Sequence, residues 1–332
     1  MTVVSALNEG IERFNAKKKA CLTFLGKAEQ LAGNFYAVFP FNNNDAYQPL
    51  NPEFLKETRQ KIQEEYLKLL IAGQFKAGKS TLINALLGQS VLPSYSTPCT
   101  AIITEITYSS TPEAILSFKT PLPATLPDAL APEAREHIER YRGKNVPDLH
   151  LTAADGDALK DKLEQYLVIP PLDNDKSRTY VAESPYALCR LLWPLELCKK
   201  GAVIIDSPGL NENKIREDTT LTYVPQADVI LHVLSALQCY GMSDAEFVDK
   251  IEKSSTSPIL FIVNRFDQLN SDKERDRTRK FALGKILSHS RYGTDGIFFL
   301  SAFQALQWRE SNTQGSKNVV ADFEKLENTI SS

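Results

Sequence analysis

The residues most suited to chemistry form a glycine-rich stretch between an apolar run and a helical pattern. Residues 73–80 read GQFKAGKS, which matches the pattern GxxxxGK[ST]. In such a loop the backbone N–H groups turn toward phosphate, and the following helix adds the positive end of its dipole. Lys79 would then reach the β- and γ-phosphates of a nucleotide, and the Ser80 hydroxyl would bind Mg²⁺. The sequence predicts a phosphate-binding loop made of Gly73, Gln74, Phe75, Lys76, Ala77, Gly78, Lys79, Ser80 and Thr81.

Further Mg²⁺ ligands are indicated at two later positions. Thr100 lies in a loop ahead of a strand-like run, where it would close over the γ-phosphate and add a second hydroxyl to the metal. The apolar run 202–205 ends in Asp206, whose carboxylate can hold Mg²⁺ through water, while the Gly209 N–H can sense the γ-phosphate. We therefore expect the metal ligands to be Ser80, Thr100 and Asp206.

The choice of base is indicated by two segments that each follow a strand-like run. Asp267, in the sequence NRFD, offers a carboxylate to the paired donors on the N1 and N2 edge of guanine, which adenine lacks. Arg265 can lie flat against the base. These positions stand at the C-terminal ends of strands, where such sheets bind ligands. The sequence favours GTP or GDP over ATP, with the base contacted by Asn264, Arg265, Asp267, Ser301 and Ala302.

The elements that must position these residues alternate along the chain. Strand-like apolar runs occupy 66–72, 101–107, 114–118, 202–205, 229–234, 259–263 and 297–300. Amphipathic helical patterns between the later runs imply a mostly parallel sheet with helices on both faces. Residues 3–32 read as one further helix, and His232, inside an apolar run, is expected to be a satisfied core residue. The predicted fold class is α/β: a P-loop GTPase domain with an added N-terminal helix.

Together the motifs resemble the bacterial dynamin-like GTPases. The resemblance rests on 79–88, 92–101, 206–210, 227–236, 264–267 and 301–302. It covers roughly residue 51 to the end, although 104–197 match only in outline. The resemblance implies GTP hydrolysis, a nucleotide-dependent homodimer formed through the GTPase face, and membrane remodelling or fusion driven through a helical stalk.

The resemblance also implies a division of the chain. Residues 1–50 would be a neck helix and loop, and 51–332 a dynamin-type GTPase domain with an insertion between about 108 and 197. The chain from Gly73 to Asp206 is much longer than in small regulatory GTPases, which agrees with an insertion. No stalk follows the last motif, so lipid contact is expected through a stalk outside this sequence. We expect a cytoplasmic protein that is peripheral on the inner membrane when full-length.

Composition, net charge and cysteine spacing exclude several classes of protein. The 332 residues are 42% hydrophobic and 24% charged, which is typical of a globular protein with a sizeable core. Their net charge of -3 argues against nucleic-acid binding by bulk electrostatics. The five cysteines are scattered and contain no CxxC pair, so a disulfide scaffold or zinc site is not expected and a reducing compartment fits best.

Two positions depart from familiar GTPase patterns. Leu210 stands where small GTPases carry a water-orienting Gln, and an apolar side chain cannot orient water. Lys76 stands where guanylate-binding proteins have an arginine finger, so we hypothesise that it supplies positive charge to the transition state once dimerisation orders the loop. A solvated loop lysine is the alternative. The expected catalytic set is Lys76, Lys79, Ser80 and Thr100.

Two other functions fit parts of the sequence. A slow, nucleotide-switched regulatory GTPase would act as a binding module, as ribosome-assembly GTPases do, but the basic RNA-binding domain expected beside it is not visible. An ATP-using P-loop enzyme is disfavoured by Asp267. Specific activity that rises with protein concentration would separate a dimerising GTPase from a monomeric switch.

Overall fold

A computed structural model describes most of the chain, as two compact units. The described residues are 3–38, 52–63, 66–93, 102–127, 130–167, 184–209, 214–311 and 317–331. The units divide between Leu67 and Lys68, and each is described by itself below. The domain division at residue 50 stays a prediction, and Thr100 and Leu210 lie outside the described residues.

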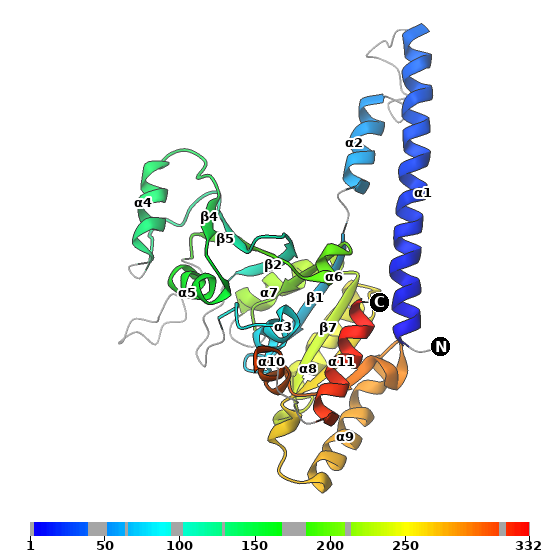
Figure 1. The fold of residues 1–332 in the computed structure, drawn as a ribbon, viewed down its shortest axis with the longest axis vertical. Helices are drawn as coiled ribbons and strands as arrows, with labels where there is room; N and C mark the ends of the chain where they lie inside the picture. Colours follow the sequence, from blue (N-terminus) through cyan, green and yellow to red (C-terminus); the bar gives the residue numbers. More distant parts are fainter. Residues whose placement is uncertain are drawn as a thin grey trace. The chain divides into compact units, whose positions relative to one another are not determined.

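The first unit contains two helices that pack side by side, α1 (Val3–Val38) and α2 (Pro52–Gln63) (Figure 1). The helix expected over 3–32 is present as α1 and continues to Val38. An ion pair joins Arg59 of α2 to Glu29 of α1, with the atoms 3.2 Å apart. The α1 side chains Phe24, Leu31 and Phe35 are exposed in this unit.

The second unit is built on a nine-stranded sheet in the order β4-β3-β5-β2-β6-β1-β7-β8-β9. Its strands are β1 (Leu67–Gly73), β2 (Ile103–Tyr108), β3 (Glu113–Phe118), β4 (Leu149–Thr152), β5 (Tyr186–Trp193), β6 (Ala202–Asp206), β7 (Val229–Ser235), β8 (Ile259–Asn264) and β9 (Ile297–Phe299). Strands β1, β7, β8 and β9 are parallel neighbours, and we call them the parallel half. Strands β2 to β5 form the extension, in which β3 runs antiparallel to both β4 and β5. The extension joins the rest of the sheet where β2 pairs antiparallel with β6.

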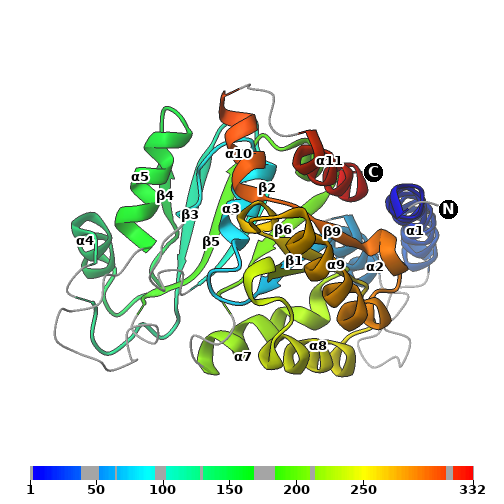
Figure 2. The same cartoon turned by 90° about the horizontal axis from the view of Figure 1, so that it is seen from below.

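Helices cover both faces of the sheet (Figure 2). The α-helices of this unit are α3 (Lys79–Leu87), α4 (Pro132–Arg140), α5 (Gly156–Leu167), α6 (Glu196–Lys199), α7 (Lys214–Tyr223), α8 (Met242–Ser254), α9 (Asp272–Ile286), α10 (Ala302–Ser311) and α11 (Lys317–Ser331). Short 3₁₀ turns are η3 (Val224–Gln226), η4 (Ala236–Gln238), η5 (Phe266–Gln268), η6 (Leu287–His289) and η7 (Gly293–Gly296). Strand residues that point to opposite faces of the sheet belong to two buried hydrophobic clusters. One cluster includes residues of α3, α10 and α11, and the other includes residues of α8 and α9. The predicted α/β fold is confirmed.

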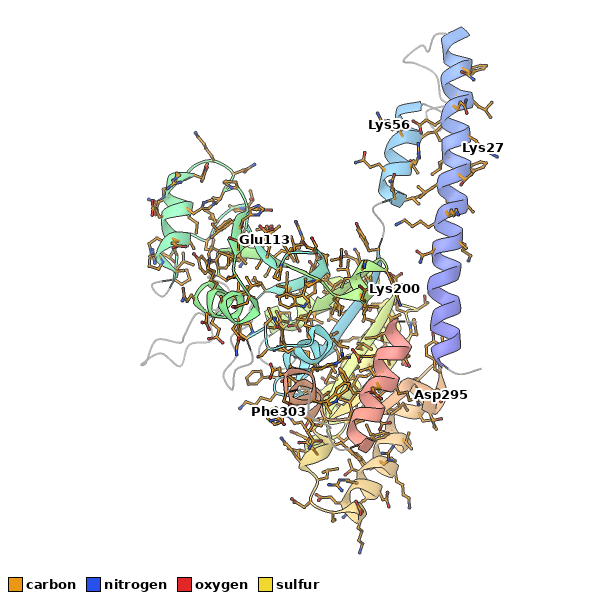
Figure 3. The ribbon with its side chains drawn as sticks, viewed as in Figure 1. Lys27, Lys56, Glu113, Lys200, Asp295 and Phe303 are labelled. Atoms are coloured by element: carbon orange, nitrogen blue, oxygen red, sulfur yellow. The ribbon has the colours of Figure 1, made fainter. Side chains whose placement is uncertain are left out.

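Two strands of the extension were not expected from the sequence. β4 has only four residues, and its exposed His150 pairs with Glu113 of β3 at 2.6 Å (Figure 3 labels Glu113). β5 is longer, but Arg190 interrupts its apolar run. No helix in the described part of the chain is long and apolar enough to cross a membrane.

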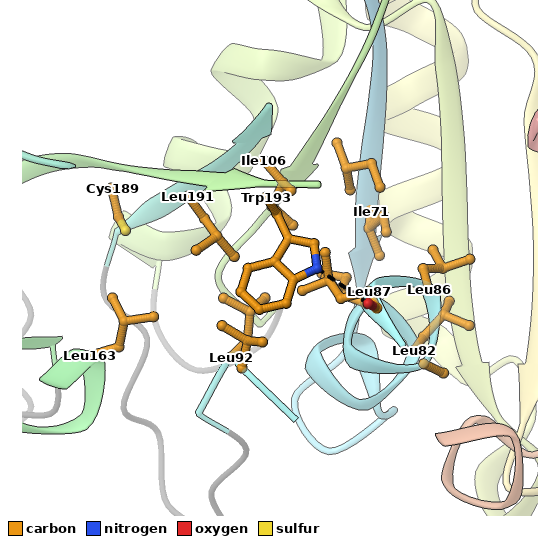
Figure 4. Packing of buried hydrophobic residues seen from close by; sticks show 14 of the residues in the cluster. Ile71, Leu82, Leu86, Leu87, Leu92, Ile106, Leu163, Cys189, Leu191 and Trp193 are labelled. Carbon is orange, nitrogen blue, oxygen red and sulfur yellow. Dashed lines mark hydrogen bonds between the residues drawn. The ribbon is translucent and has the colours of Figure 1, made fainter. Parts of the chain in front are cut away.

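The extension is fastened to the parallel half through an aromatic side chain. The Trp193 indole at the end of β5 donates to the carbonyl oxygen of Leu87, the last residue of α3, at 3.2 Å. Around it pack Leu92, Ile106 and Leu191 (Figure 4). Because α3 begins directly after the glycine-rich loop, this contact connects the extension to the helix that carries the candidate site.

Candidate functional site

The glycine-rich loop begins where β1 approaches β7 too closely for any side chain. β1 is buried from Leu69 to Gly73 and pairs parallel with β7, so that Gly73 lies opposite Val233. Gly73 has φ 153°, and a Cβ there would lie 2.2 Å from the Val233 carbonyl oxygen. Glycine is required at this position because the backbones meet there.

A second glycine ends the loop and starts α3. Gly78 has φ 95°, and a Cβ at this position would lie 2.3 Å from Nδ2 of Asn264. Between the glycines, Lys76 is exposed with φ 64°, and the Ala77 N–H donates to the Gln74 carbonyl at 3.2 Å. The loop is therefore a fixed turn that leads directly into the N-terminus of α3, the geometry that favours phosphate.

Lys79 lies over the first turn of this loop. Its side chain is buried, and Nζ donates to the carbonyl oxygens of Gly73 at 3.0 Å and Gln74 at 3.2 Å. Its neighbour Ser80 is partly exposed in the first turn of α3. An ammonium held by backbone carbonyls at a helix N-terminus can exchange these contacts for phosphate oxygens.

Asp206, at the end of β6, is a buried carboxylate whose Oδ1 has no partner among the described residues. Burial raises the pKa of Asp206 to about 7, and the charge of Lys79 opposes that rise. The following Ser207 donates its hydroxyl to the Ile71 carbonyl at 2.9 Å, which fixes the end of β6 against β1. A buried carboxylate oxygen without a partner suits a cation, so the residues fit Mg²⁺.

Asn264 joins the phosphate loop to the segment expected to contact guanine. Its Nδ2 donates to the Ala77 carbonyl at 2.8 Å, and its Oδ1 accepts from the Ala302 N–H at 2.8 Å. The next residue, Arg265, has φ 62°, which turns the chain out of β8 so that Asp267 is partly exposed. The Phe266 N–H donates to Leu300, which holds the loops after β8 and β9 together.

The structure thus brings most of the predicted residues to one edge of the sheet. The loop 73–81, Asp206, Asn264 and Ser301–Ala302 come from the ends of β1, β6, β8 and β9. Gly209 is buried just beyond β6. The segment toward Thr100 leaves from Leu92, whose backbone is held by Asn84 of α3.

Sequence reasoning missed one residue at this edge. Asp244, in the first turn of α8, accepts hydrogen bonds from the Gln74 side chain at 2.5 Å and from the Gly241 N–H at 3.0 Å. An acidic residue at the third position of a helix is a capping signal, which could have marked the start of α8. Nothing in the spacing connects it with Gln74.

The sheet order and these loops define a P-loop nucleotide-binding domain of the GTPase class. The family model described as "Dynamin family" matches residues 69–266, more than half of the chain. The chain belongs to the dynamin family and carries its GTPase domain. The resemblance found in the sequence is confirmed, and guanine-nucleotide binding follows from the family.

Individual relatives are identical to this chain at about a quarter of the aligned positions. A bacterial dynamin-like protein from Nostoc punctiforme is 28% identical over 269 residues, covering 76% of this chain and 35% of that protein. Dynamin-like protein A from Bacillus subtilis is 24% identical, and the match covers 71% of this chain and 22% of that protein. The solved structure of an oligomerised bacterial dynamin pair matches in fold with a TM-score of 0.51 at 22% identity. The match covers 93% of this chain and 43% of the solved chain. The chain therefore spans less than half the length of each of these relatives.

Proposed function

We propose that this chain is the GTP-binding and GTP-hydrolysing head of a longer dynamin-like protein, activated by nucleotide-dependent dimerisation and serving membrane remodelling or fusion. The observation that carries this is Asn264, whose amide joins the phosphate loop at Ala77 to the segment at Ala302. One side chain would thus set the distance between the proposed phosphate-binding and base-binding segments, as a nucleotide requires.

The proposed roles extend the assignments made from the motifs. Backbone N–H groups of residues 74–81 and the Lys79 ammonium would bind the phosphates, and Asp267 would select guanine. Mg²⁺, when bound, would neutralise charge on the β- and γ-phosphates, and Ser80, Thr100 and Asp206 would hold it. Arg265 would lie against the base, the Gly209 N–H would sense the γ-phosphate, and the backbone of Ser301 and Ala302 would meet the guanine oxygen.

Lys76 is proposed to add positive charge during hydrolysis. Its side chain is exposed, and Nζ lies 5.3 Å from the ring centre of the preceding residue, Phe75. Leu210 offers no group that can orient water, so a further charge from the loop would fill part of that role. An arginine finger in comparable enzymes is worth about 10³ to 10⁵ in rate.

Self-association is supported by apolar side chains at the same edge of the sheet. Leu237, in η4, is 55% exposed, and Met242, the first residue of α8, is 78% exposed. Both flank Gly241, whose N–H shares the Asp244 carboxylate with Gln74 of the loop. Exposed apolar side chains beside a ligand site favour a partner that covers them. The membrane would be reached through parts of the protein beyond this chain; a solved bacterial dynamin pair senses and tethers membranes.

Turnover measured against protein concentration tests this proposal. We expect hydrolysis of GTP but not ATP, with a specific activity that rises with concentration and is lost in Lys79→Ala. Flat, very slow turnover with tight GTP binding would instead indicate a nucleotide-switched binding module.

For Lys76→Ala we expect intact GDP binding but no rise of specific activity with protein concentration. Lys144→Ala, which changes an exposed lysine of the extension, serves as the matched control. Unchanged stimulation in Lys76→Ala would make Lys76 a bystander.

A further inference from the structure

The Gln74 side chain is held by a carboxylate from another element. Its Nε2 donates to Oδ2 of Asp244 at 2.5 Å, and the same oxygen accepts from the Gly241 N–H at 3.0 Å. Asp244 is 1% exposed. The contact therefore ties the first turn of the phosphate loop to the first turn of α8.

The surroundings make this hydrogen bond costly to lose. The other carboxylate oxygen, Oδ1, faces Nε2 of His232 at 3.5 Å, and neither atom has a hydrogen-bond partner among the described residues. The His232 ring is fully buried against Phe247 and Phe261, with ring centres 5.4 and 5.9 Å away. A buried carboxylate needs hydrogen-bond donors, and Gln74 supplies one of the two found among the described residues.

The same glutamine holds the loop lysine through its backbone. The Gln74 carbonyl accepts from Lys79 Nζ at 3.2 Å and from the Ala77 N–H at 3.2 Å. Its side chain and its carbonyl thus connect Asp244 on one side with Lys79 on the other. A displacement of Gln74 would move the group against which the ammonium rests.

We propose that Asp244 is a positioning residue for GTP hydrolysis, acting through Gln74 to fix the first turn of the phosphate loop and the Lys79 ammonium. The inference rests on the proposed hydrolysis of GTP by this chain. Charge that develops on the phosphates in the transition state is stabilised best by donors that do not have to reorganise. Loss of the Gln74 hydrogen bond should therefore lower kcat more than it weakens nucleotide binding.

The test compares Gln74→Met, Asp244→Asn and the double variant. Gln74→Met removes the donor, keeps the chain length, and leaves Asp244 free to accept from Gly241 at the start of α8. We expect each single variant to lose about tenfold in kcat for GTP, the effect of one charge-assisted hydrogen bond. The Kd for a fluorescent GDP analogue should change less than about threefold, and the double variant should be no slower than the slower single variant.

Asp249→Asn is the matched control, because this exposed carboxylate lies on the same helix and pairs only with Lys253 in the described structure. It should behave as wild type. Wild-type kcat in Gln74→Met, or losses that multiply in the double variant, would overturn the proposal. The proposal would also be overturned if only Asp244→Asn had a lower melting temperature and a lower kcat, while Gln74→Met behaved as wild type. Asp244 would then act only as a helix cap.

A readout without turnover separates this inference from the proposed function. In the nucleotide-free protein, hydrogen exchange of amides 74–77 should be faster in both single variants than in wild type and Asp249→Asn. Unchanged exchange would overturn the positioning role even if GTP is hydrolysed. Faster exchange in a chain that does not hydrolyse GTP would leave the Gln74–Asp244 tie intact and reject the proposed function instead.

Discussion

The parallel half of the sheet and the extension use similar strands for different purposes. In the parallel half, β1, β7, β8 and β9 all end at one edge, so the residues that follow them converge there. In the extension, β3 runs against both β4 and β5, so the strands do not all end at the same edge. The described candidate-site residues follow strands that end at this edge, and β3, β4 and β5 enlarge the sheet without adding described residues to the site.

The halves also differ in what they bury. Asn264 and His232 lie inside parallel strands, and Asp244 lies against them, all almost inaccessible to solvent. In the extension, the pair formed by Glu113 and His150 lies partly at the surface. Buried polar groups are costly unless they are satisfied, so they mark positions where a fold gives up stability for function.

The largest expected effect comes from breaking the link between the loops of the parallel half. Asn264→Ala removes both hydrogen bonds of the amide and leaves the Ala77 carbonyl and Ala302 N–H buried without partners, at about 1–3 kcal/mol each. We expect GDP affinity to fall by about a hundredfold or more, measured by titration calorimetry. Asn270→Ala, at an exposed position nearby, should bind normally. Binding within about threefold of wild type in Asn264→Ala would show that the loops are held in some other way.

An intermediate effect should appear with pH. Burial raises the pKa of Asp206 to about 7, so below that value the carboxyl is protonated and cannot hold a cation. The Mg²⁺-dependent part of nucleotide affinity should weaken by up to about tenfold per unit as pH falls below 7, and Asp206→Asn should abolish this dependence.

The same pKa shift predicts the opposite trend for the nucleotide-free protein. The folded state keeps the proton to higher pH than the unfolded state, so stability is lost as pH rises from about 4 to 7. Nucleotide-free Asp206→Asn should therefore melt higher than wild type at pH 8, as measured by calorimetry. Glu113→Gln, in the extension, is the control. A lower melting point for Asp206→Asn would mean that its carboxylate is already stabilised by its surroundings.

The smallest effect is expected where the two halves meet. Trp193→Phe removes the indole donor to Leu87 but keeps most of the ring packing, so about 1 kcal/mol of the unfolding free energy should be lost. Denaturant unfolding measures this, and GDP affinity should stay unchanged because the loop itself is intact. Weaker GDP binding in Trp193→Phe would show that the extension influences the site through α3.

The sequence predicted the parallel half better than the extension, for physical reasons. The strand before Gly73 is apolar from Leu69 to Ala72, and the loop needs its glycines, so both leave a strong pattern. β4 is four residues long, and β5 carries Arg190 in its middle, so neither shows a clean periodicity. Their place in the sheet comes from pairing with β3, which is a long-range contact.

Within the candidate site, the hydrogen-bond partners of the side chains could not be predicted from the sequence. No sequence pattern connects Gln74 with Asp244, because they are far apart in the chain and meet only through the packing of α8 on the sheet. His232 was expected to be a satisfied core residue. It is in the core, but both ring nitrogens lack hydrogen-bond partners among the described residues, and Oδ1 of Asp244 lies 3.5 Å from Nε2.

The indole of Trp193 has a consequence for how this molecule can be observed. The chain has only two tryptophans, and one of them is hydrogen-bonded to the end of the helix that starts at the phosphate loop. In a Trp308→Phe variant, all tryptophan emission would come from Trp193. Its wavelength and intensity would then report, without any added label, whether nucleotide binding shifts α3 against the extension.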